Sequence, residues 1–175
     1  MSSKITTVIL ALSCLTLSSC ATLKAPKFEP HPDSQAAFNY VKGLEGQWVV
    51  DGGKEGTFGW NFDVTSDGTI VIERLKVGTP TEMITVYHLE NGRLFADHYC
   101  RLGNQPHLSA VNMEVEGDLH FICDGDVGST ESHAELHMHG VHFQKKDDGV
   151  LVWMDMFQND TVTFQTSYML VRKNP

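Results

Sequence analysis

Ten short segments of apolar or alternating residues follow one another between residues 47 and 172, and turn-forming residues separate them. The segments are 47–52, 56–64, 69–77, 83–90, 93–100, 107–115, 119–124, 134–144, 150–157 and 162–172. Their breaks contain Gly, Asn and Asp, as in Asn91-Gly92 and Asp147-Asp148-Gly149. Such a pattern, uninterrupted by a helix-length apolar period, is typical of an up-and-down barrel or a sandwich. We predict an all-β, ten-stranded antiparallel up-and-down barrel over residues 44–175.

Two turns predict which side chains face the interior. Asn91-Gly92 favours a two-residue hairpin that pairs Glu90 with Arg93. The face without formal charge then holds Met83, Thr85, Tyr87, Leu89, Leu94, Ala96, His98 and Cys100. At Asn159-Asp160 the same reasoning assigns to the interior Leu151, Trp153, Asp155, Phe157, Phe164, Thr166, Tyr168 and Leu170. The two faces of segment 69–77 cannot be separated, so the direction of Glu73 stays open.

A short helix is predicted just before the barrel. Asp33 or Ser34 can cap a helix from Gln35 to Lys42, and Gly43 suits its C-terminal turn. Ala37 and Val41 would face the barrel, so we expect this helix to plug one end.

A Trp on the first strand and an Arg on the last carry a family resemblance. Gly46-x-Trp48 opens the first segment, and Arg172 lies near the end of the last. This pair resembles the closing pair of the calycin barrels, which include lipocalins, fatty-acid-binding proteins and nitrobindins. The resemblance implies that the Arg172 guanidinium lies across the Trp48 ring at a closed end, a cation–π contact.

The calycin resemblance covers residues 44–175 as architecture. Ten strands favour the fatty-acid-binding or nitrobindin type over the eight-stranded lipocalin type. The lipocalin Thr-Asp-Tyr motif is missing, and the first turn is too short for the lid helices of fatty-acid-binding proteins.

The N-terminus has the pattern of a bacterial lipoprotein signal. Residues 1–19 comprise a short n-region with Lys4 and an apolar stretch from Ile5 to Thr16, too short to be a stable membrane anchor. Leu17-Ser18-Ser19-Cys20 resembles a lipobox, which implies cleavage before Cys20 and acylation of its sulfur. Residues 20–43 would then be the lipidated cysteine, a proline-containing tether and the short helix. Ala21 in place of Asp favours the outer membrane, facing the periplasm, within the bacterial cell envelope.

The chain is acidic, with 22 Asp and Glu against 13 Lys and Arg and a formal net charge of −9. Such a balance disfavours nucleic acid as a partner. We therefore expect contact with the membrane through the acyl chains on Cys20 rather than through a basic patch.

The expected ligand is a small apolar or amphipathic molecule held inside the barrel. Its apolar walls would be Trp60, Tyr87, Trp153, Phe164 and Tyr168, and the polar groups that orient it Thr85, His98, Asp155 and Thr166. Fatty-acid-binding proteins clamp a carboxylate with an inward Arg-x-Tyr, whereas this chain reads Arg172-Lys173-Asn174, so a fatty acid is not implied. The alternative is a structural or interaction module whose barrel is filled by its own side chains.

Histidine clusters leave metal binding open as another function. The stretch His98-Tyr99-Cys100-Arg101-Leu102-Gly103-Asn104-Gln105-Pro106-His107 resembles a motif of small bacterial barrel proteins of mostly unknown function. His98 and Cys100 point the same way and could ligate a metal, or could be a hydrogen-bonded His beside a buried thiol. His137 and His139 share a strand face and could hold Zn²⁺ or Cu²⁺ if a neighbouring strand supplied a third ligand.

No cofactor is predicted. Nitrobindins bind haem through a His on a late strand, and residues 143–175 contain no His, so a haem ligand would have to be His139 or His98. A Gly-rich phosphate loop, a Cys-x-x-Cys pair and a Gly-x-Ser-x-Gly elbow are all missing from the sequence, which favours a binding protein over an enzyme.

Cys100 and Cys123 are the cysteines that remain after processing besides Cys20. Consecutive hairpins that pair residue 96 with 111, and 111 with 123, would place Cys123 level with Ala96 and two strands away. That is ~9–10 Å across the sheet, with Cys100 a further ~13 Å along its strand. A disulfide needs Cα atoms within about 7 Å, so we expect two thiols.

Overall fold

The structure, a computed structural model, describes residues 34–53, 59–112, 117–123 and 134–173. Its elements are α1 (Ser34–Gly43), β1 (Gly46–Val50), β2 (Gly59–Thr65), β3 (Ile70–Val77), β4 (Met83–Glu90), β5 (Arg93–Tyr99), β6 (His107–Asn112), β7 (Asp118–Cys123), β8 (His137–Lys146), β9 (Gly149–Gln158) and β10 (Thr161–Arg172). The predicted signal sequence, Cys20 and the tether lie outside the described residues.

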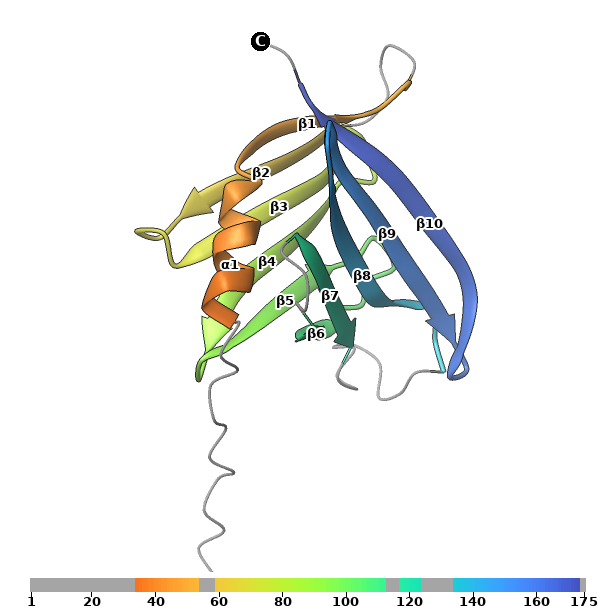
Figure 1. Ribbon diagram of the computed structural model, residues 1–175. Helices are drawn as coiled ribbons and strands as arrows, with labels where there is room; N and C mark the ends of the chain where they lie inside the picture. Colours follow the sequence, from red (N-terminus) through yellow and green to blue (C-terminus); the bar gives the residue numbers. More distant parts are fainter. Residues whose placement is uncertain (1–33, 54–58, 113–116, 124–133, 174–175) are drawn as a thin grey trace, which may run out of the picture.

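The ten strands form one closed antiparallel barrel, so the predicted fold class is confirmed (Figure 1). Each strand pairs with its neighbours in sequence, and β1 pairs with β10 to close the ring. All odd strands therefore run one way and all even strands the other. The start of β1 and the ends of β2, β4, β6 and β8 consequently lie at one end of the barrel, with α1. The ends of β1, β3, β5, β7 and β9 lie at the opposite end.

The hairpin of β4 and β5 has the predicted register. Asn91 and Gly92 both have positive φ, 49° and 76°, and Glu90 pairs with Arg93. Its predicted inner face contains most of the side chains that are buried on these strands, Thr85, Tyr87, Leu94, Ala96 and His98, while Phe95 is buried on the opposite face. Turn chemistry at two residues was sufficient here because no bulge interrupts this pair of strands.

The helix α1 covers one end of the barrel, and it packs against β4 and β5 (Figure 1). Its buried side chains include Ala37, Phe38 and Val41, which join the hydrophobic core. This end of the barrel is hence covered by apolar packing.

Trp48 and Arg172 lie directly opposite each other where β1 meets β10. The Arg172 guanidinium carbon is 4.3 Å from the centre of the Trp48 ring. The guanidinium also donates hydrogen bonds to the carbonyl oxygens of Gly43 and Glu45, and Trp48 Nε1 donates to Leu44 O over 2.7 Å. The pair thereby connects the β1–β10 contact that closes the barrel to the end of α1 and the two residues after it.

Gly46 is required beside this closing pair. Its φ is +115°, and a Cβ at this position would lie 2.9 Å from Arg172 Nη1. A side chain here would strain the backbone and displace the guanidinium, which explains the Gly in Gly46-x-Trp48.

Cys100 and Cys123 are both thiols, as expected. The two strand pairings behind that expectation were each wrong by three residues, because Ala96 pairs with Leu108 and Leu108 pairs with Cys123. The errors cancel, so Cys123 is nevertheless level with Ala96, two strands away.

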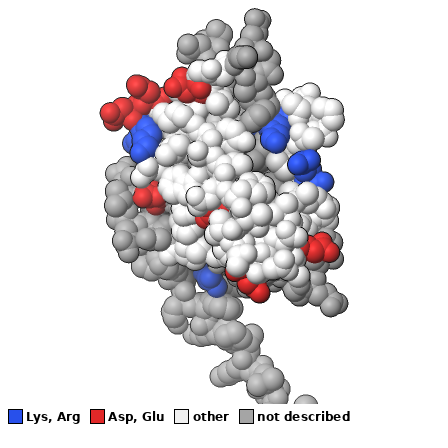
Figure 2. Space-filling model, turned by 90° about the vertical axis from the view of Figure 1, so that its right-hand side faces the viewer, with Lys and Arg blue, Asp and Glu red and all other residues white. Residues whose placement is uncertain are grey.

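Charged side chains are dispersed over the face of the molecule seen in Figure 2. On this face the described Lys and Arg side chains do not gather in one patch. No helix among the described residues is long and apolar enough to cross a membrane.

Candidate functional site

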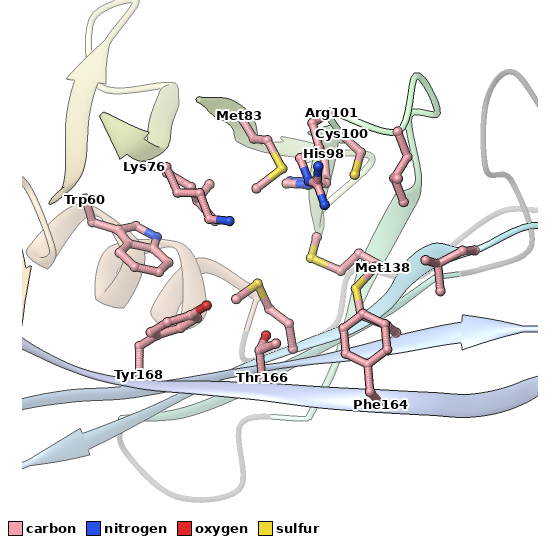
Figure 3. A pocket seen from close by; sticks show the side chains of 15 residues that line it. Trp60, Lys76, Met83, His98, Cys100, Arg101, Met138, Phe164, Thr166 and Tyr168 are labelled. Atoms are coloured by element: carbon pink, nitrogen blue, oxygen red, sulfur yellow. The ribbon is translucent and has the colours of Figure 1, made fainter. Parts of the chain in front are cut away.

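A cavity of about 140 Å³ lies inside the barrel at the end opposite α1 (Figure 3). Its walls are mainly apolar and include four of the seven methionines in the chain. The lining residues are Trp60, Leu75, Lys76, Met83, His98, Cys100, Arg101, Leu102, Leu136, Met138, Met154, Met156, Phe164, Thr166 and Tyr168. Methionine side chains have three rotatable bonds and a polarisable sulfur, so these walls can adapt to different ligands.

A buried carboxyl group lies behind the cavity wall. Glu73 on β3 is only 2 % exposed, and its carboxylate accepts hydrogen bonds from Trp60 Nε1 over 2.7 Å and from the Tyr87 hydroxyl over 2.6 Å. Burial raises the pKa of Glu73 above its usual value, and the hydrogen bonds from Tyr87, Thr85 and Trp60 oppose this shift. The sequence did not determine which face of its strand Glu73 occupies. In the structure its side chain lies inside the barrel.

Thr85 connects this carboxyl group to His98. Thr85 Oγ1 lies 3.0 Å from His98 Nδ1, and both residues are buried. A neutral imidazole either donates its Nδ1 proton to the Thr85 oxygen or accepts the proton of the Thr85 hydroxyl at this contact. Burial lowers the pKa of His98 to about 4, so the ring is neutral at pH 7. His98 therefore offers the cavity an uncharged polar group that can form a hydrogen bond with a bound molecule.

Two cations line the mouth of the cavity. Lys76 comes from the end of β3, and Arg101 follows the end of β5. Figure 3 shows the Lys76 side chain extending into the cavity between Trp60 and Met83. The chain as a whole is acidic, yet both charged residues that line the cavity are basic. The local field at the mouth thus favours an anionic group.

The loop 100–106 is held at the rim by a buried amide. Cys100 N donates to Asn104 O and Gly103 N to Cys100 O, each over 3.0 Å. Asn104 is 2 % exposed, and its Nδ2 donates to Leu136 O, just before β8. The recognised motif around Gly-Asn-Gln-Pro therefore fixes the position of Arg101 at the mouth.

Most of the predicted ligand-contacting residues come together at this cavity. Trp60, His98, Phe164, Thr166 and Tyr168 line it, while Tyr87 and Thr85 belong to the hydrogen-bonded group behind it. Sequence reasoning missed the methionines, Lys76 and Arg101. Their position at strand ends facing one rim becomes clear only once the register is known.

The predicted inward orientation of Trp153 and Asp155 is wrong. Trp153 stacks on His142 at 4.3 Å, and Asp155 accepts a hydrogen bond from Gln165 over 2.6 Å, both on the outer face. The turn pairs Phe157 with Val162 as expected, but a bulge then shifts the register so that Phe164 pairs with Met156. The bulge adds one residue to β10, so each inward residue of β10 pairs with the next residue of β9. Met154 and Met156 therefore line the cavity in place of Trp153 and Asp155.

Haem does not fit the cavity. A volume of about 140 Å³ is below the ~300–1,000 Å³ of pockets that enclose drug-sized ligands, and haem is larger than such ligands. His98 is the sole His of the described residues that lines the cavity.

The metal candidates of the sequence separate into two places. His98 lies at the cavity with Thr85 as its partner, whereas His137 and His139 lie beside Cys123. A second cluster, His120, His142 and Asp155, lies across β7, β8 and β9 on the outer face.

No protein-family model matches the chain, and no curated protein or solved structure matches it either. The class of protein therefore follows from the fold and the cavity alone: a closed ten-stranded antiparallel barrel with an internal apolar cavity at one end.

Proposed function

We propose that the barrel is a calycin-like binding protein for a small amphipathic molecule. The apolar part of the ligand enters the cavity, and an anionic end remains at the mouth with Lys76 and Arg101. The observation that carries this proposal is an apolar cavity whose two charged lining residues are both cations. Closure of the opposite end by α1 supports entry from the mouth.

The size of the cavity limits the buried part of the ligand. Its volume of about 140 Å³ is close to that of an engineered apolar cavity of ~150 Å³ that holds benzene. A ring of that size or part of an acyl chain fills it. Neutral His98 at the wall can orient a polar group on the buried part through a hydrogen bond.

Octanoate should bind in this cavity, and a larger side chain inside the barrel should weaken its binding. Thr166→Phe puts a ring into the cavity, while Ser167→Phe puts the same ring on the outer face of the same strand. Excluding two methylenes removes ~1.6 kcal/mol of burial, so Thr166→Phe should raise the Kd about tenfold or more. Isothermal titration calorimetry measures both variants, and Ser167→Phe should bind as the wild type does.

The charge of the ligand provides a second arm of this experiment. Octylammonium has a similar chain but a cationic end, so it should bind more weakly than octanoate. Arg101→Gln should reduce the difference in Kd between octanoate and octylammonium. Equal binding of both ions, or equal effects of Thr166→Phe and Ser167→Phe, would contradict the proposed site.

We further propose that the protein is a lipoprotein of the bacterial cell envelope, anchored by acyl chains on Cys20 and facing the periplasm from the outer membrane. The support is the Leu17-Ser18-Ser19-Cys20 sequence after a short apolar segment.

Cys20→Ser should give a protein without acyl chains that no longer fractionates with membranes, because one thiol carries the anchor. Fractionation and intact-mass measurement test this, with Cys100→Ser as the matched control. Membrane fractionation that persists in Cys20→Ser after cleavage of the precursor would refute the anchor.

A further inference from the structure

Three metal-binding side chains come together where β7 ends and β8 begins. Cys123 is the last residue of β7, His137 is the first of β8, and His139 follows two residues later. Their sulfur and nitrogen donor atoms all lie within 4.8 Å of one another. Cys123 and His137 are buried and His139 is half-buried. We propose that these three residues bind a divalent transition-metal ion of the zinc class.

The separation of the donor atoms is close to what a tetrahedral ion requires. Zinc–thiolate and zinc–imidazole bonds of about 2.3 and 2.0–2.1 Å place neighbouring ligand atoms ~3.3–3.6 Å apart. The donor atoms must therefore come closer to one another by about 1 Å, which small side-chain rotations achieve. Three protein ligands leave a fourth position for water or an external ligand.

Both imidazoles are already oriented. His137 Nδ1 lies 2.8 Å from the carbonyl oxygen of Glu135. A carbonyl only accepts, so Nδ1 donates and the lone pair of His137 is on Nε2, the arrangement common to metal-bound histidines. The ring of His139 stacks on Phe157 at 3.9 Å with an interplanar angle of 16°. Packing thus restricts the plane of the second ligand.

A β-bulge lies at the same place. The pairing of β8 with β9 shifts between Met138 and Gly140, so His139 is the extra residue. Bulges bend a strand locally and redirect a side chain. Here the bulge brings His139 to the end of β7, next to the thiol that the sequence alone did not associate with it.

The outer cluster of His120, His142 and Asp155 is an internal comparison. Its groups are half-buried and already engaged: the two imidazoles stack at 3.5 Å, and His142 Nε2 lies 3.3 Å from Asp155 Oδ2. It offers no sulfur. A thiolate ligand gives a charge-transfer absorption band with Co²⁺, which this comparison cluster cannot produce.

The test uses the whole protein purified without a histidine tag and loaded with Zn²⁺ or Co²⁺. We expect one tightly held Zn²⁺ per chain and a Co²⁺ spectrum with a thiolate charge-transfer band. Cys123→Ser should abolish that band, and His139→Gln should weaken Zn²⁺ binding at least ~10-fold, the lower limit for losing even an outer-shell partner. Cys100→Ser and His142→Gln are the matched controls and should retain both the band and the affinity.

Circular dichroism shows whether each variant is folded. If Cys123→Ser unfolds, His139→Gln still tests the site, because His139 is half-buried and its replacement disturbs the fold less. A Co²⁺ complex without a thiolate band, or a band that survives Cys123→Ser, would overturn the proposal. So would Zn²⁺ binding that depends on His142 rather than on His139.

Discussion

Trp48→Ala should lower the free energy of unfolding by about 3–5 kcal/mol, the usual cost of removing a buried aromatic side chain. Trp48 is 5 % exposed, and its ring lies under the guanidinium of Arg172. Arg172→Ala should cost less, since only the cation–π contact and the hydrogen bonds to Gly43 and Glu45 are lost. Because the two side chains touch, the double variant should deviate from additivity by about 0.5–3 kcal/mol.

Urea unfolding of the four proteins in this cycle gives the coupling energy directly. Arg93 on β5 is the matched cation for a control cycle, because its guanidinium carbon lies 5.2 Å from the centre of the Phe95 ring and it is not on the strands of Trp48 and Arg172. Trp48→Ala and Arg93→Ala should add within ~0.3–0.5 kcal/mol. Strict additivity of Trp48→Ala with Arg172→Ala would show that this contact does not close the barrel.

Glu73→Leu should destabilise the protein by about 2–6 kcal/mol. The change leaves two fully buried donors, Trp60 Nε1 and the Tyr87 hydroxyl, without their acceptor, and each loss costs about 1–3 kcal/mol. Glu73→Gln retains an acceptor oxygen and the volume of the side chain, so it should cost much less. Urea denaturation at one pH compares the two variants, and equal losses would show that the hydrogen bonds do not account for the effect.

The same residue should give the stability a characteristic dependence on pH. The pKa of Glu73 is raised in the folded state, so above its unfolded value of 4.5 the folded protein binds more protons than the unfolded chain. Stability from this group is hence full below pH 4.5 and declines as the pH rises through the folded pKa. His98, whose pKa is lowered to about 4, acts in the opposite sense between about pH 4 and 6.5.

Subtracting the profile of Glu73→Gln from that of the wild type isolates the contribution of Glu73, because His98 is present in both. The difference should fall with rising pH. A difference that is flat, or that rises, would mean that the Glu73 carboxyl group is not desolvated in the folded protein.

The number of strands and one half of the barrel interior could be predicted from turn chemistry. Asn91 and Gly92 fix a hairpin by their positive φ values, and strict alternation then places Thr85, Tyr87 and His98 inside. The inward side of the helix was likewise predictable from Ala37 and Val41, since an apolar pair four residues apart lies on one helical face.

The other hairpin shows where such reasoning fails. Asn159 and Asp160 also have positive φ, and their turn has the expected pairing, but the bulge after Val162 reverses the alternation of β9. Nothing in the sequence from Val162 to Phe164 marks the bulge. Trp153 and Asp155 were consequently assigned to the wrong face.

The grouping of Cys123 with His137 and His139 depends on long-range register and could not be predicted either. Thirteen residues separate the end of β7 from the start of β8. The sequence indicated that a third ligand would have to come from a neighbouring strand, but not which residue would supply it. The inward direction of Glu73 was equally undetermined, because both faces of β3 carry apolar residues.

Native mass spectrometry of the protein isolated from its own cells tests the central claim most directly. Beyond the mass of a bound metal ion and of acyl chains on Cys20, we expect a non-covalent organic adduct of one discrete mass, one per chain. This adduct should be retained by Ser167→Phe and lost from Thr166→Phe. A non-covalent organic adduct that survives Thr166→Phe would contradict the proposed site. So would a chain that carries no such organic adduct and takes up none of the added octanoate.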